Sequence, residues 1–121
     1  MRKTTMPSSA PKIKDDELYR LVRDGKIEEF NTRHTNGEDC DLQGADFRNV
    51  DLTDLNADGL NLSDSYFRMS NLRGIDFTNT CLEGASIHGA QISGVLFPVG
   101  LDANEILLSL EHGTRLRYKG Q

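Results

Sequence analysis

The sequence predicts an all-β solenoid with a helical element at each end, and three observations lead to this fold class. Residues 40–99 repeat with a period of five and divide into twelve pentads without a gap. The third residue of every pentad is apolar, and the fifth is Gly, Asn or Asp in ten of the twelve. The flanking residues lack this period and instead carry apolar side chains at helical spacing.

The period of five excludes both a regular helix and a straight strand. Five residues of α-helix rotate a side chain by roughly 140°, which would spread the apolar positions around the helix. In a strand, an odd period would place successive apolar residues on opposite faces. The chain must therefore bend once per pentad, and Gly, Asn and Asp accept such turns, including positive φ. We expect the third-position side chains to point inward as the core: Leu42, Phe47, Leu52, Leu62, Phe67, Leu72, Phe77, Leu82, Ile87, Ile92 and Phe97.

Two segments precede the repeats. Residues 1–14 contain Thr, Ser, Pro and Lys with few large apolar side chains, and we predict a flexible basic tail. Residues 15–37 are predicted to form an N-terminal helical cap, because a solenoid exposes an apolar cross-section that terminal elements must cover. Asp15 or Asp16 can cap its first helix, which should stop near Gly25, and a second short helix should follow.

Three pentads carry a resemblance to a known family. Residues 45–49 (ADFRN), 70–74 (SNLRG) and 75–79 (IDFTN) resemble the A(D/N)LXX unit of the pentapeptide-repeat proteins. The resemblance implies a right-handed quadrilateral β-helix, in which four pentads make one coil and residues 20 apart stack. Residues 38–99 would then form about three coils of this pentapeptide-repeat β-helix.

Residues 100–121 are predicted to form a C-terminal helix and tail. Asp102 followed by Glu105 resembles a capping box, and Gly113 is placed to end the helix. The apolar stripe of this helix is either a cap on the last coil or a dimerisation element: Ile106, Leu107 and Leu110. Together with the N-terminal flank, this segment resembles the flanks of short bacterial pentapeptide-repeat proteins, and related family members often dimerise through C-terminal segments.

The composition excludes several classes of protein. No apolar run approaches the roughly 18 residues that a membrane span needs, and the basic start lacks the apolar core of a signal peptide. The sequence therefore predicts a cytoplasmic protein. Two cysteines are too few for a disulfide scaffold, and a net charge of −5 argues against general nucleic-acid binding.

Residues with catalytic or metal-binding chemistry do not form a motif. The histidines, His34, His88 and His112, lack the spacing that places two imidazoles on one metal. The glycines follow the pentad period and do not form a phosphate-binding loop. Acid–base catalysis needs two carboxyl groups held in a cleft with separated pKa values, which a convex solenoid does not supply. We therefore expect no enzymatic activity, no metal and no cofactor.

Acidic residues gather in the repeats, where residues 38–99 hold 10 acidic and 3 basic side chains. A candidate acidic interaction face lies around the first coil: Asp41, Asp46, Asp51, Asp54 and Asp58. These side chains either satisfy backbone groups in the turns and keep the surface soluble, or contact a partner. A fourth-position column of Arg48, Arg68 and His88 interrupts the acidic pattern and is itself a candidate for holding a small anion.

The leading functional hypothesis is a non-enzymatic protein-interaction module with an unknown protein partner. The family resemblance implies an alternative, since some pentapeptide-repeat proteins imitate DNA and act on DNA gyrase or topoisomerase IV, both type II topoisomerases. Three coils span only about 15 Å, less than half of one DNA turn of roughly 34 Å. A second alternative is a structural homodimer with no separate ligand. None of these hypotheses requires direct contact with nucleic acid or a membrane.

Overall fold

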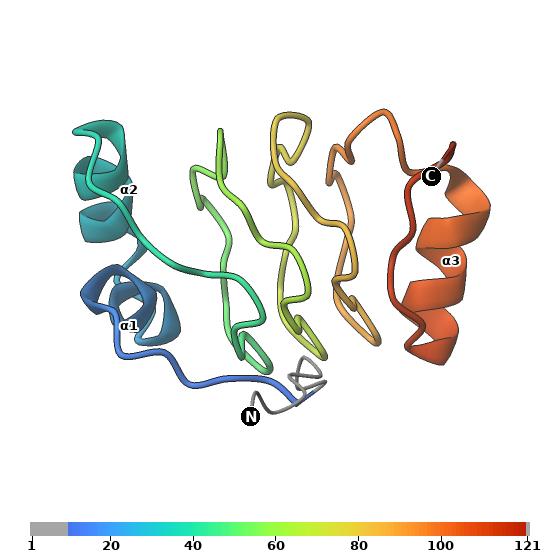
Figure 1. Cartoon of the computed structure of the whole chain (residues 1–121), viewed down its shortest axis with the longest axis horizontal. Helices are drawn as coiled ribbons and strands as arrows, with labels where there is room; N and C mark the ends of the chain where they lie inside the picture. The colour runs from blue at the N-terminus through green and yellow to red at the C-terminus, as the bar shows by residue number, and fades with distance from the viewer. Residues whose placement is uncertain (1–9, 121) are drawn as a thin grey trace, which may run out of the picture.

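The computed structural model describes residues 10–120, which form an elongated stack (Figure 1). Two short helices, α1 (Glu17–Arg23) and α2 (Ile27–Thr35), lie at one end of the repeats, and α3 (Ala103–His112) lies at the other. Residues 1–9 of the predicted tail lie outside the described residues. Within the described part, no helix combines the length and the apolar character needed to cross a membrane.

The N-terminal helices form for local reasons. Asp16, rather than Asp15, is the N-cap of α1, and its carboxylate accepts a hydrogen bond from the Tyr19 N–H at 3.1 Å. α1 ends before Gly25, whose φ of 78° allows the turn into α2. Both helices bury apolar side chains in the common core: Leu18, Leu21, Val22, Ile27 and Phe30.

The repeats are arranged in columns whose members are 20 residues apart. We call the pentads 40–44, 60–64 and 80–84 the first column, and the pentads that follow them the second, third and fourth columns in chain order. Four successive pentads make one coil, so that the coils 1, 2 and 3 are residues 40–59, 60–79 and 80–99. Isolated parallel bridges join the members of a column: Asp46 to Tyr66, Asp51 to Asn71, Asn61 to Cys81, Tyr66 to Ser86, Asn71 to Gln91 and Asp76 to Leu96.

Backbone hydrogen bonds connect neighbouring coils in every column. In the second column, the Phe47 N–H donates to Tyr66 O at 2.8 Å, and the Phe67 N–H donates to Ser86 O at 2.8 Å. Only a few consecutive residues pair in each column, because the chain bends again within the pentad. The expected helices are present at both ends, whereas within residues 10–120 the repeats form isolated bridges without a continuous strand.

Turns at the fifth position use the left-handed backbone region in most pentads, as predicted, with Asn79 and Val99 as the exceptions. Asn49, Asp54 and Asp64 have φ values of 59°, 72° and 60°, and the fifth-position glycines are also at positive φ. Met69 occupies the same conformation, with a φ of 59°, although its side chain has no preference for it. The repeat therefore imposes this geometry even where the residue type does not favour it.

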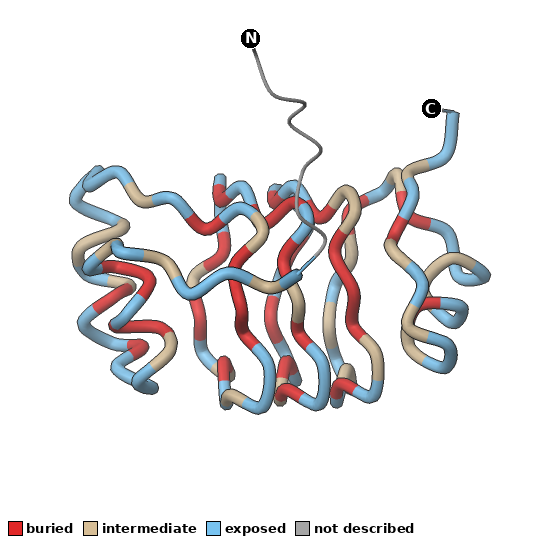
Figure 2. Tube along the Cα trace, turned by 60° about the horizontal axis from the view of Figure 1, so that its bottom comes forward, coloured by how far each residue is buried: buried red, intermediate tan, exposed pale blue. Residues whose placement is uncertain are grey.

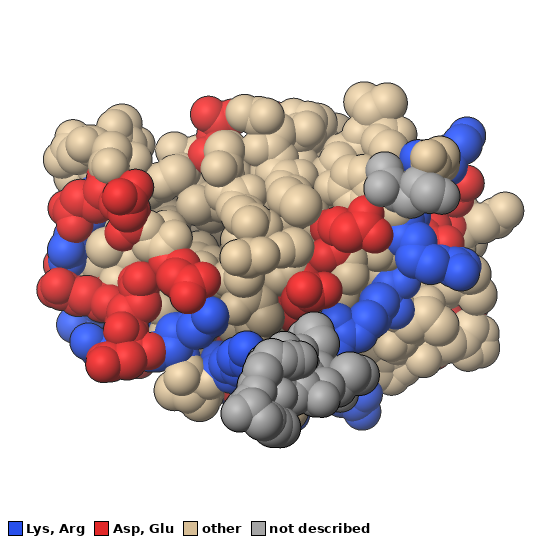
Figure 3. Space-filling view, in the orientation of Figure 1, with Lys and Arg blue, Asp and Glu red and all other residues tan. Residues whose placement is uncertain are grey.

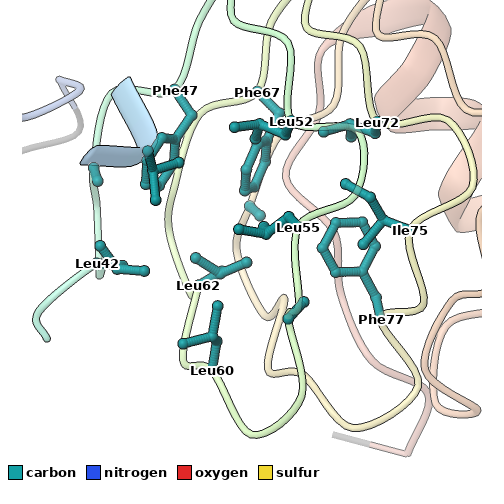
Figure 4. Close-up of a cluster of buried hydrophobic side chains, with 14 of the residues drawn as sticks. Leu42, Phe47, Leu52, Leu55, Leu60, Leu62, Phe67, Leu72, Ile75 and Phe77 are labelled. Carbon is teal, nitrogen blue, oxygen red and sulfur yellow. The ribbon is translucent and has the colours of Figure 1, made fainter. Parts of the chain in front are cut away.

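Third-position side chains fill the interior (Figure 4), and buried and exposed positions follow each other closely along every coil (Figure 2). Nine of the eleven predicted core residues are buried: Leu42, Phe47, Leu52, Leu62, Phe67, Leu72, Phe77, Leu82 and Ile87. The rings of Phe47 and Phe67 stack with their centroids 5.5 Å apart. Ile92 and Phe97 are only partly buried, because no further coil covers them.

Second-position Asp side chains fix the turns. The Asp51 carboxylate accepts hydrogen bonds from the Thr53 N–H at 3.0 Å and from Thr53 Oγ1 at 2.7 Å. Asp76 makes the same two bonds with Thr78, at 2.9 and 2.7 Å. These bonds favour the ionised carboxyl, so the backbone N–H, followed by the threonine hydroxyl, lowers the pKa of each aspartate.

Asp46 departs from the expected acidic face because its side chain is buried. It is 6% exposed, and Arg48 donates to its carboxylate from Nε at 2.9 Å and from Nη2 at 3.0 Å. The side-chain hydrogen bond from Arg48 lowers the pKa of Asp46, against the opposing effect of burial. The expectation that Asp46 lies on an exposed interaction face is therefore corrected, since its charge is paired within the fold.

Phe67→Ala is expected to lower the free energy of unfolding by about 3–5 kcal/mol, because it removes a ring packed between Phe47 and Phe77 and leaves a cavity. Urea unfolding followed by circular dichroism measures the change. The control is Met69→Ala, since Met69 is 56% exposed and its truncation should cost less than about 1 kcal/mol. A Phe67→Ala midpoint equal to that of the wild type would contradict the core assignment.

Asp46→Asn keeps a hydrogen-bond acceptor in the turn but removes the charge. The folded pKa of Asp46 lies below the unfolded value of about 3.9, so its ionised form stabilises the fold above that pH. This contribution is lost as the pH falls through the folded pKa. The variant should be less stable than the wild type at pH 7 and approach it at pH 2.

Urea midpoints measured from pH 2 to pH 7 test this expectation. Asp39→Asn is the control for removal of one charge, because Asp39 is exposed and its replacement at pH 7 should change the free energy of unfolding by less than about 0.5 kcal/mol. A difference between the wild type and Asp46→Asn that stays constant across the pH range would argue against a stabilising ion pair.

Candidate functional site

The N-terminal cap and Lys12, which precedes it, supply hydrogen bonds that a preceding coil would otherwise supply to coil 1. The outward N–H groups of the second-position residues have partners in three columns: Asp41 with Asp16 Oδ2 at 3.0 Å, Asp46 with Lys12 O at 2.9 Å, and Asn56 with Asn31 Oδ1 at 2.8 Å. Outward carbonyl groups are capped as well. Arg23 Nη1 donates to Arg48 O at 2.7 Å, and His34 Nε2 lies 2.7 Å from Asp58 O.

The third column of coil 1 is left open. Among the described residues, the Asp51 N–H, Asp51 O and Thr53 O have no hydrogen-bond partner. A concave site of about 490 Å³ adjoins them, between this column and the start of α2. Three of its seven lining residues are acidic and none is basic: Gly25, Ile27, Glu28, Asn31, Asp51, Thr53 and Asp54. We call this site the acidic cavity.

The five candidate acidic residues do not form one surface. Asp41 pairs with Lys14, whose Nζ lies 3.0 Å from Asp41 Oδ2, and this hydrogen bond lowers the pKa of Asp41. Asp58 accepts a hydrogen bond from Asn79 Nδ2 at 2.9 Å. With Asp46 buried, the structure brings two of the five candidates together at one site, namely Asp51 and Asp54 in the acidic cavity.

The surface charge of the molecule is also uneven. Figure 3 shows many acidic side chains, with basic ones among them, over the end that carries α1 and α2, and a mostly uncharged area over the upper part of the repeats. Towards α3, acidic and basic side chains are mixed. On this face, the repeats therefore do not present a continuous acidic surface.

At the opposite end, the chain after coil 3 caps the first two columns. As predicted, Asp102 caps the start of α3, where its carboxylate accepts a hydrogen bond from the Glu105 N–H at 3.0 Å, and Gly113 caps the end with a φ of 75°. Its residues and the following segment replace a further coil: Tyr118 Oη accepts from the Leu82 N–H at 3.0 Å, Leu116 donates to Ala85 O at 2.8 Å, and Ser109 Oγ accepts from the Ile87 N–H at 3.0 Å.

The third and fourth columns of coil 3 have no such cover. The N–H groups of Ile92, Gly94 and Phe97 have no hydrogen-bond partner within residues 10–120. Large apolar side chains are exposed at this end of the molecule: Leu96, Val99, Leu107 and Leu108. The end that carries α3 therefore combines open backbone groups with apolar side chains.

The apolar stripe predicted on α3 is divided between covered and exposed side chains. Ile106 and Leu110 pack against the core, so they cap the repeats. Leu107 lies on the outer side of the helix and is 48% exposed. Sequence reasoning grouped these three residues together, because helical spacing alone does not say which part of a wide apolar stripe is covered.

Residues with metal-binding or nucleophilic chemistry stay apart. Within the described part of the chain, no group of three His, Cys, Asp or Glu side chains is placed to hold a metal ion. Burial raises the pKa of the Cys40 thiol to about 11, and Cys81 is an exposed free cysteine. In the candidate anion column, Arg48 is already paired with Asp46, and His88 Nδ1 is buried with no hydrogen-bond partner among the described residues.

The repeats of this chain match a known protein family. The family model described as pentapeptide repeats matches the chain in 8 copies, over residues 26–54, 38–68 and 61–97. Searches of curated proteins and of solved structures found no match. The matched residues span more than half of the chain and contain most of the stacked columns. The chain belongs to the pentapeptide-repeat family.

Proposed function

We propose that the protein is a non-enzymatic, cytoplasmic protein-interaction module that contacts its partner through the end that carries α3. The observation that carries this proposal is the exposure of Leu96, Val99, Leu107 and Leu108 at that end. Single exposed apolar residues are ordinary on a protein surface, whereas several gathered at one end favour an interaction site. The open N–H groups of coil 3 add hydrogen-bonding capacity at the same place.

We further infer that the coils wind as the right-handed quadrilateral β-helix of the family. The 20-residue offset of the bridges supports four pentads in each coil. The positive φ values at fifth positions support a corner at the end of each pentad. Such a helix has two ends and regular sides, so a partner that binds an end meets a different surface from one that binds a side.

Two acidic side chains of coil 1 have structural roles. Asp46 is paired with Arg48, and Asp51 holds the turn at Thr53. These pairings also reduce the support for DNA mimicry, which needs many free carboxylates spaced along one side. An interaction through the apolar end does not depend on that spacing.

A homodimer is a second candidate, favoured by the exposure of Leu107. α3 has 10 residues and is therefore about 15 Å long. The outer side of a helix of this length is smaller than the roughly 800 Å² per partner of a stable interface. A dimer would need α3 together with Leu96 and Val99 from coil 3.

Leu107→Glu and Leu110→Glu form a matched pair on α3. Leu107→Glu should change the melting temperature by less than about 5 °C, because its side chain is already half exposed. Leu110→Glu places a charge against the core and should cost about 2 kcal/mol or more. Thermal unfolding measures both changes. If Leu107→Glu unfolds as readily as Leu110→Glu, the outer side of α3 belongs to the cap and the proposed contact surface is wrong.

Light scattering over a range of concentrations distinguishes the two candidates. The interaction-module proposal predicts a mass near the 13.5 kDa of one chain, and the homodimer candidate predicts about twice that mass. For a dimer, Leu107→Glu should restore the single-chain mass while the fold remains intact by circular dichroism. A dimer that survives Leu107→Glu would place its interface away from α3.

A further inference from the structure

The N-terminal cap leaves the carbonyl groups of Asp51 and Thr53 without a hydrogen-bond partner among the described residues. Both residues line the acidic cavity, whose volume is about 490 Å³. We propose that this cavity receives an arginine side chain from an extended segment of a protein partner. The inference rests on the proposed function as an interaction module, and it places a second contact surface at the opposite end of the molecule from α3.

The neighbouring column shows how such carbonyl groups are capped. In the second column, Arg23 Nη1 donates to Arg48 O at 2.7 Å, and Tyr19 Oη donates to Asp46 O at 2.8 Å. Thr53 is the fourth residue of its pentad in the third column, and Arg48 is the fourth residue of its pentad in the second column. A guanidinium group supplied by a partner would donate to the Thr53 carbonyl in the third column, as Arg23 donates to the Arg48 carbonyl in the second.

The lining of the acidic cavity favours a cation with several hydrogen-bond donors. Glu28, Asp51 and Asp54 contribute negative charge. The Asn31 amide is already engaged, because it donates to Asp54 O at 2.8 Å and accepts from the Asn56 N–H at 2.8 Å. The remaining polar groups are mainly acceptors, which matches a guanidinium group with five N–H donors and no acceptor. Like-charge repulsion disfavours an anion at this site.

The same place can also bind the backbone of the segment that carries the arginine. Asn71, the next member of the column, donates its N–H to Val50 O and accepts the Leu52 N–H at its carbonyl, both at 2.9 Å. Asp51 holds the equivalent position in coil 1, and its N–H and C=O are open. An extended segment laid along this edge would bond to Asp51 as coil 1 bonds to Asn71.

A matched pair of double variants tests the site against general electrostatic attraction. Glu28→Gln with Asp51→Asn removes two charges from the acidic cavity. Glu29→Gln with Asp76→Asn removes two charges of the same kinds elsewhere. Glu29 shares the first turn of α2 with Glu28, and Asp76 fixes a turn with the same two hydrogen bonds as Asp51. Both double variants have the same net charge.

The probe is acetyl-Gly-Arg-Gly-amide, titrated into the isotope-labelled full chain and followed by NMR. We expect saturable shifts of the amide signals of Asp51, Thr53 and Asp54. The cavity variant should weaken binding about tenfold, and the control variant less than about twofold. The same peptide with citrulline in place of arginine keeps the shape but lacks the charge, and it should bind at least about tenfold more weakly.

Three results would overturn the proposal. The first is the absence of a saturable shift at Asp51 and Thr53. The second is equal weakening in the two double variants, which would show attraction without a site. The third concerns this chain's own basic residues: if Arg2→Gln with Lys3→Gln moves the Asp51 and Thr53 signals without any probe, the occupant is residues 1–9 and not a partner.

Leu107→Glu separates this inference from the proposed function. This variant should bind the arginine peptide as the wild type does, because Leu107 lies at the other end of the molecule. If a captured partner depends on Leu107 while the peptide does not bind, the acidic cavity proposal fails alone. If the peptide binds and Leu107→Glu leaves every association unchanged, the contact surface at α3 fails alone.

Discussion

The backbone ladder between coils is the constraint on which the rest of the structure depends. Each coil presents N–H and C=O groups that are satisfied by residues 19 to 21 positions away, and this repeats in every column. The ladder has no natural end, because the first and last coils present the same groups outward. The helices and extended segments at both ends form hydrogen bonds with part of these outward N–H and C=O groups. The columns that they leave open decide where another chain can add hydrogen bonds.

The period of five was sufficient to predict most of the core, because an inward side chain and a left-handed turn tolerate few residue types, whereas the columns of residues 20 apart were implied by the resemblance to the family. The caps at Asp16, Asp102 and Gly113 were also predictable, since they depend on hydrogen bonds within a few residues. Coil 3 shows the limit of this reasoning. Ile92 and Phe97 obey the period but are only partly buried, because burial depends on what lies beyond the last coil.

The acidic cavity was less predictable, because it depends on contacts between distant segments. Asp46 and Asp51 hold the same position in consecutive pentads, yet Asp46 is buried and Asp51 is open. A local signal separates them: Arg48, two residues after Asp46, folds back on its carboxylate, whereas Thr53 leaves Asp51 facing the cavity. No local signal places Glu28 beside Asp51. An acidic first turn is ordinary for a helix, and only the docking of α2 makes it part of a site.

The two ends of the molecule offer similar backbone edges with different side chains around them. A ladder edge can bond to any extended segment, so the surrounding side chains decide which segment binds. The acidic cavity near α2 disfavours an acidic segment, and the apolar side chains around α3 disfavour an unpaired charge. The three coils between them span only about 15 Å at the usual inter-strand spacing. One partner domain can therefore reach both ends, provided that it presents a basic segment to one and an apolar segment to the other.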